Sequence, residues 1–262
     1  MQLLQKMPAA LQARLRDAVI EENREGMSGT GVFHLERSGQ PDEYLKVAER
    51  YSKQDLPAEV SRLLWLRERL PVPEVLYWGE HGQRQYLLMS AVPGLPLYDE
   101  TMRDQLPTLM RLYADGLRQI HSIAAENCPF DMRLDVKIAQ AAERVQAGLV
   151  DVDNFDPERR GRTAQSLFRE LLATRPPSED LVFTHGDYCT PNVLIDPDAL
   201  RVSGFIDWNR AGIADRYTDL ALAARSIDYN FGAEWIPPFF EAYGIEPDSA
   251  KLAFYKLLDE FF

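Results

Sequence analysis

Alternating apolar and polar positions predict β-strands in the first third of the chain. In the stretch 43–48, Leu45 and Val47 share one face, and Tyr44 and Lys46 share the other. This period of two is typical of a strand with one buried face. Further strands are expected at 32–35, at two places within 72–92 joined at His81-Gly82 (the second at 85–90), at 193–195 and at 202–206.

Apolar residues repeat with a helical period over most of the rest of the chain. Helices are expected at 105–123, 134–147, 162–174, 217–229, 233–243 and 248–261, and from Pro57 to Leu66. A weaker helical pattern covers 7–20, where Leu11, Leu15 and Val19 recur. His121 lies in an apolar-periodic helix, so we expect it to be packed or on the surface and not to bind a metal.

A cluster of proline and glycine separates the strand-rich part from the helical part. Pro93-Gly94-Leu95-Pro96 follows the last strand of the first third, and such clusters mark loops and hinges. We therefore expect an amino-terminal lobe of residues 1–92, a hinge at 93–97 and a carboxy-terminal lobe of residues 98–262.

The negative charge is concentrated in the second of these parts. Of the formal charge of −12, residues 1–95 carry 12 basic and 13 acidic side chains, and residues 96–262 carry 17 basic and 28 acidic ones. Such a surface disfavours nucleic acid, which binds through Lys and Arg, and attracts polycations. An acidic surface that serves solubility alone is the alternative.

Other features of the composition narrow the class of protein. With 45% hydrophobic residues in 262, the chain is long enough to bury a large core. No apolar run approaches the ~20 residues of a membrane helix, and the first residues lack the pattern of a signal peptide. We therefore expect a cytoplasmic protein without a membrane partner. Cys128 and Cys189 are far apart, which favours reduced thiols over a zinc site.

The most specific chemistry lies in residues 183–212. His185-Gly186-Asp187 is followed after four residues by Asn192, and Asp207 follows the strand expected at 202–206. This spacing is that of the kinase motif H-R-D-x-x-x-x-N with glycine in place of arginine. In a phosphotransferase one carboxylate faces the acceptor hydroxyl, and an amide and a second carboxylate hold Mg²⁺ on the nucleotide.

A lysine and a glutamate in the first third have the spacing of a nucleotide site. Lys46 lies in a strand and Glu59 on the first turn of the next helix, as in kinases, where the lysine contacts phosphates and the glutamate holds it. A solvated edge lysine and an ordinary helix-start glutamate are the alternatives. Ser28 lies in a glycine-rich turn that fits either phosphate binding or a plain hairpin.

These motifs carry a family resemblance. The HGD motif with Asn192, the segment ADRYTDLALAARSI and the terminal LAFYKLLDEFF resemble the aminoglycoside 3'-phosphotransferases, which are antibiotic-resistance kinases. The resemblance implies an α+β, protein-kinase-like two-lobed fold, with an antiparallel sheet and one helix in the first lobe and a mainly helical second lobe. It also implies transfer of the γ-phosphate of ATP, with Mg²⁺, to the 3'-hydroxyl of cationic antibiotics of the kanamycin and neomycin type.

The resemblance also implies a role for each matching residue. Asp187 would act on the acceptor hydroxyl, and Asn192 and Asp207 would hold Mg²⁺. The nucleotide would contact Ser28, Tyr44, Lys46 and Glu59, and the hinge residues Met89, Ser90, Ala91 and Val92. The aminoglycoside would contact Asp156, Asp187, Arg210, Arg225, Asp228, Asp259, Glu260 and the carboxylate of Phe262. Met89 also fits simple core packing.

The acids at the terminus support a cationic substrate. Asp259, Glu260 and the carboxylate of Phe262 end a helix, where the dipole disfavours anions, so something must compensate for their charge. The resemblance implies that protonated amino groups of the antibiotic bind Glu260 and the terminal carboxylate; a frayed tail is the alternative. Pro157 and Ser226 stand where some relatives have an acid, which leaves Glu158 and Asp228 as substitutes. Asn209 replaces a glycine of the family.

Two other functions remain open at this stage. A kinase of the same fold acting on another hydroxylated small molecule, such as choline, homoserine or a macrolide, fits the motif as well. A pseudokinase or binding module without catalytic activity is disfavoured because Lys46, Asp187, Asn192 and Asp207 are all present. We expect a monomer or a weak homodimer.

Overall fold

The computed structural model describes residues 7–23, 31–50 and 56–262. The chain divides into two compact units. The first comprises residues 1–94 together with 203–209, and the second comprises residues 95–202 together with 210–262. The lobe boundaries proposed from the sequence stay a prediction.

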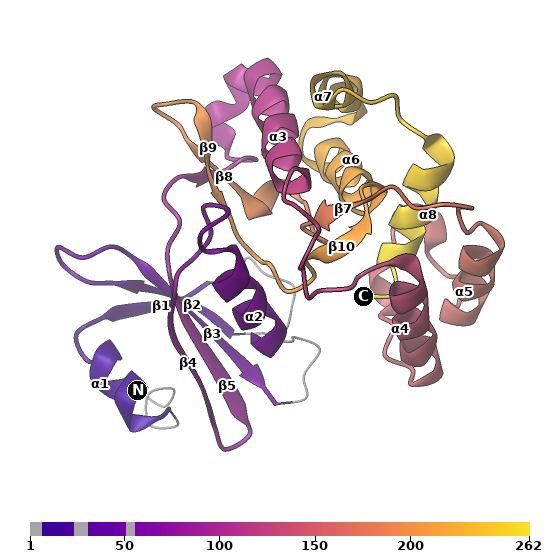
Figure 1. Ribbon diagram of the computed structural model, residues 1–262. Coiled ribbons are helices and arrows are strands. Elements are labelled where there is room, and N and C mark those ends of the chain that lie inside the picture. Colours follow the sequence, from indigo (N-terminus) through magenta and orange to yellow (C-terminus); the bar gives the residue numbers. More distant parts are fainter. Residues whose placement is uncertain (1–6, 24–30, 51–55) are drawn as a thin grey trace. The chain divides into compact units, whose positions relative to one another are not determined.

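An antiparallel sheet of five strands forms the centre of the first unit (Figure 1). Its strands are β1 (Val19–Asn23), β2 (Gly31–Glu36), β3 (Glu43–Glu49), β4 (Val75–His81) and β5 (Arg84–Ser90), in the order β1-β2-β3-β5-β4. Helix α1 (Ala9–Leu15) packs through Leu11 and Leu15 against Leu45 and Val47. Lys46, on the opposite face of β3, reaches helix α2 (Leu56–Leu66). The two faces expected for 43–48 are therefore confirmed.

The helix expected at 7–20 is wrong in its second half. Helix α1 ends at Leu15, and Val19 begins β1, which pairs with β2 from Val19 opposite Glu36 to Asn23 opposite Val32. Val19 is 59% exposed. The helical spacing of Val19 after Leu11 and Leu15 was therefore a coincidence. Pairing with β2 decides the conformation at Val19, because an apolar pattern of only three residues is weak evidence for a helix.

The second unit is mainly helical. Its helices are α3 (Leu106–His121), α4 (Leu134–Gln146), α5 (Ala164–Ala173), α6 (Tyr217–Phe231), α7 (Ile236–Tyr243) and α8 (Ser249–Asp259), with short 3₁₀ turns η2 (Glu100–Gln105), η3 (Val152–Asn154), η4 (Pro157–Arg159), η5 (Thr190–Asn192) and η6 (Ala233–Trp235). Helix α3 packs on α7, and α6 packs on α8. The chain ends beside α4 (Figure 1).

Two small antiparallel sheets carry the loops that bear the motif residues. One pairs β7 (Leu181–Thr184) with β10 (Gly212–Asp215), and the other has the order β6 (Leu95–Pro96), β8 (Val193–Asp196) and β9 (Arg201–Phe205). The HGD motif leaves the end of β7, and η5 leads directly into β8. Short strands thus fix both ends of the segment 185–192.

Candidate active site

Lys46 of the first unit is a buried cation held by two carboxylates. Its ammonium group donates to Glu59 at 2.7 Å and also to Asp207. Burial alone would lower the pKa of Lys46, but the two carboxylates outweigh burial and raise that pKa. Glu59 is 1% exposed. The spacing read from the sequence therefore does form an ion pair, and the solvated edge lysine is excluded.

Asp207 is held in an unusual backbone conformation. Its φ angle is 63°, a region that non-glycine residues adopt at a cost, often at functional sites. The segment before it is tied to the first unit, because the backbone N–H of Phe205 donates to the carbonyl of Pro71 at 3.0 Å. This conformation directs the Asp207 carboxylate to Lys46.

Two of the residues expected to contact the nucleobase already have their backbone N–H groups in hydrogen bonds. The N–H of Ser90 donates to the carbonyl of Glu74 at 3.0 Å, and that of Ala91 donates to the carbonyl of Asp42 at 2.9 Å. Met89 is 6% exposed within β5, opposite Tyr44 of β3, so it packs in the core. A ligand therefore cannot use the N–H groups of Ser90 and Ala91 without breaking these bonds. Ser28 lies outside the described residues.

The HGD loop of the second unit has a fixed backbone. Gly186 has a φ angle of +81°, and a Cβ atom there would overlap the carbonyl group of Arg210. The glycine is therefore required by the backbone, as an arginine at this position would not fit. Asp219 of α6 is fully buried and accepts the N–H groups of His185 at 2.7 Å and of Gly186 at 2.8 Å.

Asp219 is a site residue that sequence reasoning missed. It also accepts from His121 at 3.0 Å, and the His121 side chain is 4% exposed, so this histidine is packed and not on the surface. The available signal was an aspartate inside the apolar run of α6, because a fully buried carboxylate has to be satisfied by donors. Its role is to position the loop that carries Asp187.

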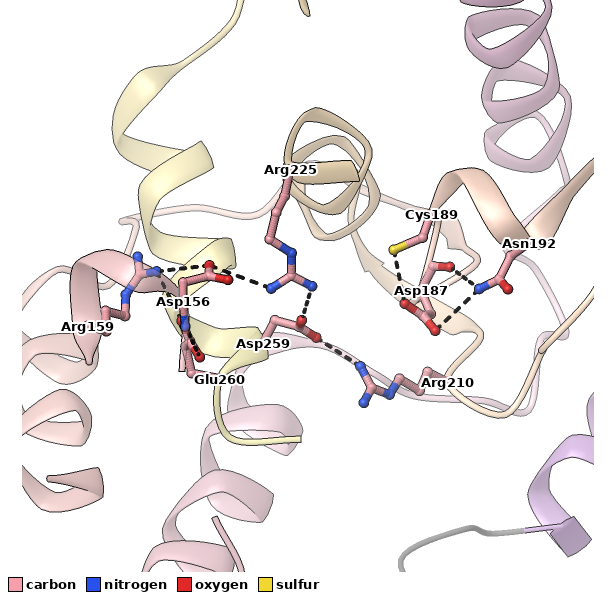
Figure 2. A network of polar contacts seen from close by, with 9 residues as sticks. All are labelled: Asp156, Arg159, Asp187, Cys189, Asn192, Arg210, Arg225, Asp259 and Glu260. Atoms are coloured by element: carbon pink, nitrogen blue, oxygen red, sulfur yellow. Dashed lines mark hydrogen bonds and ion pairs between the residues drawn. The ribbon is translucent and has the colours of Figure 1, made fainter. Parts of the chain in front are cut away.

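Neutral donors hold the carboxylate of Asp187 (Figure 2). The amide nitrogen of Asn192 lies 2.9 Å from the carbonyl of Asp187 and 3.3 Å from its Oδ2 atom, and the thiol of Cys189 lies 3.4 Å from Oδ1. Burial and the nearby Asp187 carboxylate raise the pKa of Cys189 well above its usual value. The structure thus brings Asp187 and Asn192 together, and the amide oxygen of Asn192 is left as an acceptor for a hard cation.

The acids expected to bind substrate form ion pairs with arginines (Figure 2). Asp259 pairs with Arg210 at 2.8 Å and with Arg225 at 2.5 Å. Glu260 accepts the N–H of Asp156 at 3.1 Å and pairs with Arg159 at 3.1 Å, and Arg159 also pairs with Asp156 at 3.2 Å. Asp156, Arg210, Arg225, Asp259 and Glu260 are thus brought together, and Arg159 is a member that the sequence did not indicate.

The two terminal acids differ in how easily they ionise. Burial by itself raises the pKa of Asp259, but Arg210 and Arg225 outweigh it and hold that pKa below its ordinary value. Burial, with Asp156 nearby, raises the pKa of Glu260 to about 7 in spite of Arg159. Asp259 is therefore a firm anion, whereas Glu260 gains or loses its proton near neutral pH.

The remaining expected substrate residues are Phe262 and Asp228. Phe261 is fully buried, and the ammonium of Lys137 lies 3.1 Å from the centre of the Phe262 ring, so the end of the chain is packed and not frayed. Asp228 is exposed near the end of α6 and does not take part in the network of Figure 2. Pro157 begins η4, and the side chain of Glu158 is 66% exposed at 2.9 Å from Arg159.

Within residues 7–23, 31–50 and 56–262, no three His, Cys, Asp or Glu side chains gather as a metal cluster. None of the helices in these ranges is long and apolar enough to cross a membrane.

The chain is similar to known phosphotransferases. Residues 19–255 match the model of the phosphotransferase enzyme family. The chain is 43% identical over 249 residues to an aminoglycoside 3'-phosphotransferase of Streptomyces fradiae, covering 91% of this chain and 93% of the relative. The crystal structure of an aminoglycoside 3'-phosphotransferase of type VIII matches with a TM-score of 0.89 and 39% identity, covering 97% of each chain.

A third match is a structure with bound ligands. The aminoglycoside phosphotransferase APH(3'')-Id of Streptomyces rimosus, in complex with ADP and streptomycin, has a TM-score of 0.81 at 30% identity and covers 96% of this chain and 95% of that one. The similarity to these structures confirms the expected kinase-like α+β fold.

Proposed function

Because the chain belongs to the phosphotransferase enzyme family, we propose that it is an aminoglycoside 3'-phosphotransferase. It transfers the γ-phosphate of ATP to the 3'-hydroxyl of antibiotics of the kanamycin and neomycin type, and thereby confers resistance. The observation that carries this proposal is the set of relatives named as aminoglycoside 3'-phosphotransferases, among them one 43% identical over 249 residues. The ordered HGD loop with its paired acid cluster supports it.

Asp187 is the residue that acts on the acceptor. Its carboxylate accepts a hydrogen bond from the 3'-hydroxyl and orients that oxygen toward the γ-phosphorus. As the new O–P bond forms, the bond to the leaving ADP oxygen breaks and the hydroxyl proton passes to Asp187. Because the transition state is loose, positioning matters more than base strength, and the contacts with Asn192 and Cys189 supply that positioning.

The nucleotide binds through residues of the first unit. Lys46 donates to the α- and β-phosphates, and Glu59 keeps its ammonium in place. With the N–H groups of Ser90 and Ala91 already bonded, the backbone N–H of Val92 is the donor left to the base. Tyr44 and Ser28 complete the contacts with the base and the phosphates.

Asn192 and Asp207 are the residues that would hold Mg²⁺. The amide nitrogen of Asn192 is turned to Asp187, so its oxygen is the ligand atom, and Asp207 offers a carboxylate. Both are hard oxygen donors, as Mg²⁺ prefers. When bound, the ion neutralises charge on the phosphates.

Substrate ammonium groups bind the acids of the second unit. Asp156, Asp259, Glu260 and the Phe262 carboxylate are the contacts, with Arg210 and Arg225 holding the acids and Asp228 at the rim. The excess of acidic residues in 96–262 supports this assignment, because an acidic surface attracts polycations.

A kinase for another hydroxyl is the second candidate. The matched enzyme with bound streptomycin bears the designation 3'', so relatives of this fold differ in the position that they phosphorylate. We further expect a cytoplasmic protein that is a monomer or a weak homodimer and binds neither nucleic acid nor membranes.

An ADP-release assay separates these candidates. Kanamycin and neomycin should support turnover, whereas an aminoglycoside without the 3'-hydroxyl, streptomycin and simple alcohols should not. Turnover of the 3'-deoxy compound at the same rate would move the reaction to another hydroxyl. Absence of turnover with every aminoglycoside would refute the proposal.

A further inference from the structure

Three carboxylates converge on one nitrogen of Arg159, and Figure 2 shows two of them, those of Asp156 and Glu260. Its Nη1 atom lies 3.2 Å from Asp156, 2.9 Å from Glu158 and 3.1 Å from Glu260. A single cationic nitrogen among carboxylates is the arrangement that a substrate ammonium group would need in the same place. The chain itself therefore supplies the cation at this point.

Glu260 is closed off while Arg159 is in place. Its side chain is 4% exposed and that of Arg159 is 8% exposed, whereas those of Arg210 and Arg225 are each 30% exposed. The Glu260 carboxylate therefore exposes little surface to an ammonium group from solution while this ion pair is in place. Glu260 is thus available to substrate only by exchange.

The remaining contacts of Glu260 and Arg159 would keep the loop 151–161 in place during this exchange. Both oxygens of Glu260 accept the N–H of Asp156, at 3.1 and 3.3 Å, and this bond does not involve the guanidinium. Glu158, the third partner of Arg159, is 66% exposed, so the guanidinium can keep this partner while it turns outward.

We infer that Arg159 is an internal stand-in for a substrate ammonium group, and that binding of the aminoglycoside replaces its guanidinium on Glu260. This inference rests on the proposed function. The displacement has a cost, so the apparent affinity is reduced by the small fraction of molecules in which Glu260 is open. A ligand without an ammonium group near Glu260 cannot compensate for that cost, and Arg159 therefore contributes to specificity for polycations.

Removal of the guanidinium should tighten binding. In Arg159→Gln the dissociation constant of kanamycin, measured by calorimetry without nucleotide, should fall on the order of tenfold, and nucleotide affinity should stay unchanged. Arg162→Gln is the matched control, because Arg162 pairs with Glu170 on the surface, with both side chains about 40% exposed, and should leave both affinities unchanged. If Arg159 only pins the loop, Arg159→Gln would instead weaken kanamycin binding or leave it unaltered, and either result overturns the inference.

A measurement on the wild-type chain covers the case in which Arg159→Gln does not fold. The guanidinium nitrogen signal of Arg159, assigned by its loss in Arg159→Lys, should shift when kanamycin saturates the protein and should not shift with nucleotide. A signal unmoved by kanamycin overturns the exchange. Wild-type turnover separates a failure of this inference from a failure of the proposed function. If kanamycin is phosphorylated but the Arg159 signal does not shift, only the inference about Arg159 fails. If kanamycin is neither bound nor phosphorylated, the proposed function fails as well.

Discussion

In the first unit two carboxylates share one lysine, whereas in the second unit three arginines share Asp156, Asp259 and Glu260. Lys46 is the group that would meet the anionic phosphates, and Glu59 and Asp207 hold it meanwhile. The acids of the second unit would meet ammonium groups, and arginines hold them. Each cluster thus keeps its ligand-binding charge neutralised from within, because a buried unpaired charge is costly. Ligand binding is then an exchange of partners, and its strength depends on how firmly the internal partner is held.

The largest effect is expected from substitution of Asp187, which belongs to neither charged cluster and has neutral donors on its carboxylate. Asp187→Asn should lower kcat by about 10²- to 10⁴-fold, as loss of a positioned base does, with nucleotide and kanamycin affinities nearly unchanged. Steady-state kinetics and calorimetry check this, with Asp198→Asn on an exposed turn as control. A variant that keeps more than about a tenth of the rate would remove Asp187 from its role.

The lysine cluster should respond as one unit. Lys46→Ala loses charge-assisted bonds to two phosphates, worth roughly 1.5–3 kcal/mol each, so the KM for nucleotide should rise by at least about a hundredfold. Glu59→Ala should show a weaker form of the same defect, because Glu59 only holds the lysine. The double variant should be no worse than Lys46→Ala. Additive defects in the cycle would show that the pair does not act together in binding.

A change at the end of the chain should weaken kanamycin binding and leave nucleotide affinity unchanged. Deletion of Phe262 moves the terminal carboxylate, and the loss of one charge-assisted bond should weaken kanamycin binding about tenfold. Phe262→Ala is the control, since it keeps the carboxylate and removes only the ring under Lys137. Calorimetry should show a smaller loss for this control. Equal losses for kanamycin and nucleotide on deletion would mean that the terminus is structural.

The smallest effect concerns the titration of Glu260. Burial raises its pKa to about 7, so between pH 4.5 and 7 the folded state holds a proton that the unfolded state has released. Stability therefore falls as pH rises through this window. Glu260→Gln should flatten that slope in urea unfolding followed from pH 4.5 to 7.5. An unchanged slope in the variant would assign the dependence to other groups.

Local spacing was enough to predict much of what the structure contains. The period of two in 43–48 put Lys46 on the face opposite Leu45, and the next helix brought Glu59 to it. The interval from Asp187 to Asn192 is a single short loop, so their contact needs only local geometry. Val19 was assigned to a helix because three apolar residues cannot distinguish a short helix from the partner strand that β2 provides.

What the sequence by itself determined is therefore the identity of the motif residues, the change from strands to helices, and the family. Only the tertiary structure decided how the charges are balanced. Asp219 reaches the HGD loop from 33 residues away, and Arg159 reaches Glu260 from 101 residues away. Such pairs depend on which helices pack together, and a carboxylate expected to be free for substrate looks the same in the sequence as one that an arginine already holds. The physical reason is that charge pairing is fixed by distance in space and by burial, and neither is a property of local sequence.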